Sequence, residues 1–106
     1  MANGIPVLAS ERGALPETLG DSGFVFTISD RYTQGGLAIP TPHEVAPWVA
    51  TIERLWDEPQ FEARHSALAR AESKRWLPDR LTQCYHHVFE DVVEECKIRQ
   101  RSRCQT

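Results

Sequence analysis

The sequence has no apolar run long enough to cross a membrane. Its longest apolar runs, such as Ile5–Ala9, are far shorter than the roughly 18 residues that a span needs. It also lacks an excess of basic charge, since 12 Lys and Arg stand against 15 Asp and Glu and give a net charge of -3 at pH 7. Such a chain has no global field that would hold nucleic acid. The N-terminus lacks the basic and apolar segments of a signal peptide, so we expect a cytoplasmic protein.

The cysteines lack the spacing of a metal or redox motif. Cys84, Cys96 and Cys104 are odd in number, and none belongs to the C-x-x-C pattern of a zinc or redox site. In a reducing cytoplasm we expect free thiols, with Cys84 and Cys96 as helix-packing residues. Cys84, His87 and Asp91 share a helix face, but a closed zinc site needs about four ligands, so no metal site is predicted. A small thiol or metal protein built around Cys84 and His87 is a weaker alternative.

What the chain does contain is the composition of an ordinary folded protein. It has 106 residues, of which 41% are hydrophobic and 25% are charged. These fractions are typical of globular domains and unlike those of disordered chains. The length corresponds to one domain or less, which leaves no room for a two-domain enzyme within these residues.

Two short apolar segments predict β-strands. Ile5–Ala9 is a mainly β-prone run bounded by turn residues, and Gly23–Ile28 is a second. Between them, Ser10–Gly13 reads as a loop and Ala14–Leu19 as one helical turn. Runs of this kind are typical of parallel strands, which belong in a sheet covered on both faces. The predicted fold class is α/β, with a few short parallel strands followed by three helices.

Helical signals begin at Thr41. The run Thr41-Pro42-His43-Glu44 fits a capping box with proline at the first helical position. Apolar side chains then recur at helical spacing on one face, namely Val45, Trp48, Val49, Ile52, Leu55 and Trp56. We expect Trp48 and Trp56 to be core residues. Pro47 removes one backbone donor, so this helix is either kinked there or begins nearer Ala46.

Two more helices are predicted, from Pro59 to about Trp76 and from Pro78 to Cys96. The histidines in these helices, His65, His86 and His87, are expected to lie on the surface or to have hydrogen-bond partners within the helix. Residues 97–106 collect basic side chains and are expected to form a disordered tail.

The best-placed candidate site is the turn after the first strand. In open α/β sheets, ligands bind beyond the carboxyl ends of strands, and a loop leading into a helix can hold phosphate. Ser10-Glu11-Arg12-Gly13 occupies that place, and Arg12 could contribute a cation. The turn matches neither G-x-G-x-x-G nor a P-loop, so pattern alone favours an ordinary strand-to-helix turn. No residue is predicted to be catalytic.

A longer pattern covers the segment Met1–Phe26. It reads Met1-Ala2-Asn3-Gly4-Ile5-Pro6-Val7-Leu8-Ala9-Ser10, followed by Gly13-Ala14-Leu15-Pro16-Glu17. This resembles the C-terminal half of family 4 glycosyltransferases of the GT-B fold, whose usual run is E-A-M-A-x-G-x-P-V-x-A-S, then G-G-x-P-E and a later glycine. The matching positions are Met1, Ala2, Gly4, Pro6, Val7, Ala9, Ser10, Gly13, Pro16, Glu17 and Gly23. Ala14 departs from the second glycine of the family, and Glu44–Asp57 agrees more loosely.

The resemblance implies a retaining, hexosyl-type transferase that takes its sugar from a nucleotide-sugar donor, such as a UDP- or GDP-sugar, and needs no resident cofactor. Residues 1–96 would be part of a Rossmann-like donor-binding domain, with Ser10, Arg12, Gly13 and Glu17 as donor-loop residues. The E-x7-E pair of the family would precede Met1. We therefore expect a truncation or a mis-called start, inactive without the N-terminal domain or another chain.

The alternative is a non-catalytic interaction module. Two short strands leave their sheet edges without partners, and the apolar helix faces could dock on another chain. An exposed sheet edge would also allow the chain to form a homo-oligomer.

Overall fold

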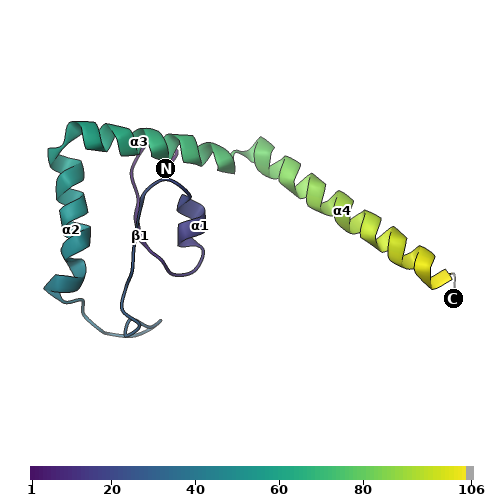
Figure 1. Cartoon of the computed structure of the whole chain (residues 1–106), viewed down its shortest axis with the longest axis horizontal. Helices are drawn as coiled ribbons and strands as arrows, with labels where there is room; N and C mark the ends of the chain where they lie inside the picture. The colour runs from purple at the N-terminus through teal and green to yellow at the C-terminus, as the bar shows by residue number, and fades with distance from the viewer. Residues whose placement is uncertain (105–106) are drawn as a thin grey trace. The chain divides into compact units, whose positions relative to one another are not determined.

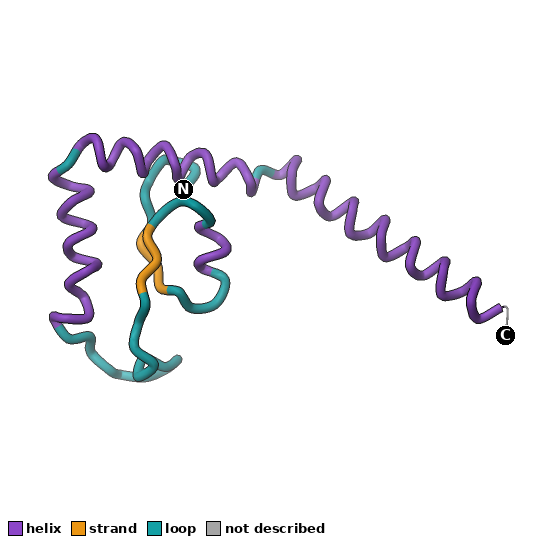
Figure 2. Tube along the Cα trace, viewed as in Figure 1, coloured by secondary structure: helices purple, strands orange, loops and turns teal. Residues whose placement is uncertain are grey.

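The computed structural model describes residues 1–104, with side chains through residue 102. The chain forms two compact units, Met1–Lys74 and the residues from Arg75 onward. Figure 2 shows helices over most of the chain and two short strands in the first unit. The predicted α/β class, with short parallel strands followed by helices, is confirmed at this level.

The sheet consists of two parallel strands, β1 (Leu8–Ser10) and β2 (Phe24–Phe26). Leu8 lies opposite Phe24, and Ser10 lies opposite Phe26. The N–H of Phe24 also donates to the carbonyl of Val7 at 2.8 Å. The first strand begins later than the predicted Ile5–Ala9, and proline at position 6 has no N–H to donate to a ladder.

Helix α1 (Leu15–Leu19) lies beside β1 (Figure 1). It ends at Gly20, whose N–H donates to the carbonyl of Pro16 at 3.0 Å. Leu19 is 3% exposed and Ala9 is 7% exposed, so these two residues form the small core between the helix and the sheet.

Helix α2 (Pro42–Asp57) begins with the predicted capping box: Thr41 is the N-cap, and its side chain accepts from the N–H of Glu44. The helix therefore does not begin near Ala46. No residue of α2 is buried. Trp48 is half-buried against Phe26, with ring centroids 4.7 Å apart. Trp56 is 87% exposed, so the prediction that it is a core residue is wrong.

Helix α3 (Pro59–Ser73) packs against α2 and supplies the rest of the core. Phe61 and Ala69 are its buried residues, and Ala69 is only 1% exposed. The ring of Phe61 lies 5.9 Å from that of Phe24, which joins α3 to the sheet. Within this unit, the apolar contacts of the sheet are thus made by α1, α3 and Trp48.

A short 3₁₀ turn, η1 (Lys74–Trp76), is followed by α4 (Pro78–Cys104), a single helix. The predicted end at Cys96 is too early, because the helix continues through the segment expected to be a separate tail; residues 105–106 lie outside the described residues. Cys84 and Cys96 are exposed, so their predicted packing role is wrong: α4 is the only long element of its described unit. Among the described residues, no helix is long and apolar enough to cross a membrane.

Candidate functional site

Two loops leave the carboxyl ends of β1 and β2 side by side, because the strands are parallel. The carboxylate of Glu11 accepts from the N–H of Ile28, at 3.0 Å to Oε2 and 3.2 Å to Oε1. Arg12 donates through Nη2 to the carbonyl of Ser29 at 2.7 Å, and through Nη1 to the carbonyl of Tyr32. The turn after β1 therefore holds the loop after β2 in place.

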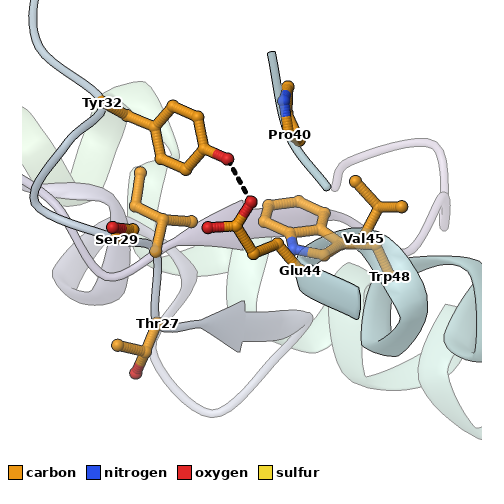
Figure 3. A pocket seen from close by; sticks show the side chains of 8 residues that line it. Thr27, Ser29, Tyr32, Pro40, Glu44, Val45 and Trp48 are labelled. Atoms are coloured by element: carbon orange, nitrogen blue, oxygen red, sulfur yellow. Dashed lines mark hydrogen bonds between the residues drawn. The ribbon is translucent and has the colours of Figure 1, made fainter. Parts of the chain in front are cut away.

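A cavity of about 400 Å³ lies beyond the carboxyl end of β2. Its walls come from the loop after β2 and from the start of α2, and Figure 3 shows the side chains that face it. The lining residues are Thr27, Ile28, Ser29, Tyr32, Pro40, Glu44, Val45 and Trp48. This volume is within the range of small-molecule pockets, about 300–1,000 Å³, and the location is where open α/β sheets bind ligands.

Glu44 connects the cavity to the helix cap. Its Oε2 accepts from the Tyr32 hydroxyl at 2.5 Å, as the dashed line in Figure 3 marks, and from the Thr41 N–H at 2.8 Å. The Thr41 hydroxyl donates to the same oxygen at 3.0 Å, and Arg31 donates to it as well. The bonds from Thr41, Tyr32 and Arg31 lower the pKa of Glu44 to about 2, so this carboxylate is ionised at neutral pH.

The four predicted donor-loop residues lie along one segment. Ser10 ends β1, Arg12 and Gly13 form the turn, and Glu17 lies in α1. Gly13 has a φ of 62° and open space where a side chain would be. None of the four lines the cavity, although Arg12 holds its loop.

The cavity was not predicted from the sequence. The capping box identified Glu44 as a helix-start residue, and periodicity identified Trp48 as a core residue. Neither signal predicts that Tyr32 lines the cavity, because Tyr32 lies in a loop whose sequence has no periodic pattern. The position of this loop is itself a signal for a binding site, because the loop follows the carboxyl end of a strand, where binding loops are usual.

His65 differs from its prediction as a surface or hydrogen-bonded residue. Its ring contacts both Phe24 and Phe61, with ring centroids 4.5 Å and 4.4 Å away, respectively. Its Nδ1 is buried and has no hydrogen-bond partner among the described residues. Burial, followed by the charges of Arg64 and Arg54, lowers the pKa of His65, so the neutral imidazole is favoured.

Cys84, His87 and Asp91 do share one face of α4, where they line a shallow hollow with Arg80, Gln83 and Val88. All belong to one helix, so no second segment converges on them within the described unit. In the described part of the chain, no group of three His, Cys, Asp or Glu side chains is placed to hold a metal ion.

Known proteins do not identify the site: no protein-family model, no curated protein and no solved structure matches the chain. The case for a function therefore rests on the residues and their geometry.

Proposed function

We propose that the chain contributes to the nucleotide-sugar-binding half of a retaining glycosyltransferase. The observation that supports this most directly is the unit formed by β1, α1 and β2, whose strands pair in parallel. The Ser10–Glu17 segment leaves the carboxyl end of β1, which is the ligand-binding edge of open α/β sheets. The family pattern that this segment resembles assigns it to the donor loop, within a Rossmann-like domain of the GT-B fold.

The glycines of that pattern adopt conformations that favour glycine. Gly13 and Gly23 have φ values of 62° and 75°, in the left-handed region. A Cβ on Gly23 would lie 2.6 Å from the carbonyl oxygen of Val7, so a side chain there would clash with the backbone just before β1. The pattern therefore coincides with a structural unit whose turns need these residues.

The chemistry of such a donor requires groups that stabilise the diphosphate as the sugar–phosphate bond breaks. Arg12 has five N–H donors, and two of its nitrogens already donate to loop carbonyls. Its guanidinium would thus hold the loop and still offer N–H groups to a phosphate oxygen. No residue of the chain is assigned to catalysis, and the family's E-x7-E pair is not among its residues.

Thermal stabilisation tests the proposal. At about ten times Kd, a ligand that binds only the folded chain adds about 1.4 kcal/mol. We expect UDP-glucose or GDP-mannose to raise the melting temperature of the chain, and Arg12→Ala to weaken this effect. Arg64→Ala, which removes an exposed arginine from α3, is the matched control and should not weaken it. Equal loss in both variants, or no rise with either donor, would contradict the proposal.

A second candidate, a module that docks on another chain, is favoured by the exposed apolar side chains of the first unit. Leu37 is 95% exposed, Trp56 is 87% exposed and Ile39 is 84% exposed. The two-stranded sheet also has outer edges without strand partners among the described residues. This candidate predicts a stable oligomer at micromolar concentration by sedimentation, and no stabilisation by nucleotide sugars.

A further inference from the structure

The cavity beyond β2 combines apolar walls with a single polar edge. Val45 and Trp48 from α2, with Ile28 and Pro40 from the loop between β2 and α2, are its apolar lining residues. The ring of Phe26, in β2, packs against the indole of Trp48, with ring centroids 4.7 Å apart. A rigid aromatic wall of this kind favours a ligand with an apolar face.

The polar edge offers a hydrogen-bond acceptor. Glu44 receives all its hydrogen bonds from described residues at Oε2, and none of these residues donates to Oε1. The side chain remains 28% exposed. An ionised carboxylate only accepts hydrogen bonds, so the open oxygen selects a ligand group that donates one. Thr27 and Ser29 also line the cavity.

The charge of the cavity excludes strongly charged ligands. Arg31 is paired with Glu44, so the carboxylate is already compensated by a cation. An ammonium ligand would compete with Arg31, whereas a phosphate would meet no Lys, Arg or His among the lining residues. A guanine base would need two neighbouring acceptor oxygens, of which only Oε1 is open.

We propose that this cavity binds a neutral sugar ring, with its apolar C–H face on Trp48 and a hydroxyl donated to Glu44 Oε1. A sugar ring has both features that the walls require, an apolar face and several O–H donors. The cavity is separate from the Ser10–Glu17 donor segment, and this inference goes beyond the proposed function and does not depend on it.

Binding to the full chain can be followed through the indole N–H signals of its three tryptophans and the backbone amides of a nitrogen-15-labelled sample. The probes are the methyl glycosides of glucose, mannose and galactose, with choline, inorganic phosphate and guanosine as alternatives. We expect at least one glycoside to shift the signals of the Trp48 indole and of the Thr27–Ser29 amides saturably. The expected Kd is in the millimolar range, which corresponds to a binding free energy of about -4 kcal/mol. Trp56 and Trp76 should not respond.

A matched pair of variants keeps the test independent of overall folding. Val45→Phe fills the cavity, whereas Val49→Phe adds the same ring to an exposed position of α2 that does not line it. We expect V45F to weaken glycoside binding at least tenfold, with V49F close to wild type and the remaining amide spectra unchanged. Equal effects in the two variants would overturn the proposal. So would the absence of any glycoside response, or a stronger response of Trp48 to choline, phosphate or guanosine.

Discussion

Arg12 donates a hydrogen bond through Nη2 to the carbonyl oxygen of Ser29 at 2.7 Å, which joins the turn after β1 to the loop after β2. The turn is the segment that the sequence pattern assigns to the donor loop, and the loop lines the cavity beside Trp48. A change in the turn is therefore expected to reach the cavity, and this connection can be tested residue by residue.

Arg12→Lys should loosen the loop after β2. Lysine keeps the charge but cannot span two carbonyls with a planar fork. Because the two Arg12 bonds are only partly shielded from water, we expect the free energy of local opening of the loop to fall by about 1 kcal/mol. The Tyr32 amide, which donates to the Ser29 carbonyl, should then exchange roughly fivefold faster. Hydrogen exchange measures this, and Arg64→Lys is the control. Unchanged exchange at Tyr32 in R12K would contradict the assigned bonds.

Gly23→Ala should destabilise the first unit more than Gly13→Ala does. Both glycines have positive φ, which costs an alanine about 1–2 kcal/mol. Only at Gly23 does the added Cβ also meet backbone, at 2.6 Å from Val7, whereas Gly13 has open space. We expect G23A to lower the free energy of unfolding, measured with urea, by about 1–3 kcal/mol more than G13A does. Equal costs would show that Gly23 and the Val7 carbonyl do not approach as described.

The carboxylate of Glu44 should titrate far below its ordinary pKa, at about 2. Its folded pKa lies below the unfolded value of 4.5, so its stabilising effect is complete above that value and is lost as the pH falls towards 2. Tyr32→Phe removes one donor and should raise the pKa of Glu44, while the larger effect of Thr41 keeps it below 4.5. Carbon-13 NMR of the carboxyl groups reports this. Tyr85→Phe on α4 is the control and should leave the Glu44 titration unchanged.

Protonation of His65 should weaken the packing of α3 on the sheet. Its folded pKa lies below the ordinary 6.5, so the unfolded chain takes up the proton first as the pH falls. The free energy of unfolding should therefore be fully maintained above about pH 6.5 and decline as the pH falls below that value. His65→Phe should remove this decline, whereas His86→Phe, at an exposed position, should retain it. A decline of the same size in H65F would rule out His65 as its cause.

Local signals predicted local structure well. The capping box depends on Thr41 and Glu44, three residues apart, and both of its hydrogen bonds form as expected. The same residues did not reveal that Glu44 also binds Tyr32, because that contact depends on how the loop folds back. Periodicity placed Trp56 on an apolar face, but it cannot say whether another element covers that face. His65 was misplaced for the opposite reason, since Phe24 approaches it from the distant sheet.

The central claim is that the Ser10–Glu17 segment binds a nucleotide-sugar donor, and amide chemical shifts measured during titration with UDP-glucose and GDP-mannose test it most directly. The account predicts that one donor shifts the amides of this segment saturably, with those of Thr27–Ser29 following less strongly through Arg12. Shifts confined to Trp48 and the cavity would contradict the donor site. No saturable shift from Ser10 to Glu17 with either donor would contradict the claim outright.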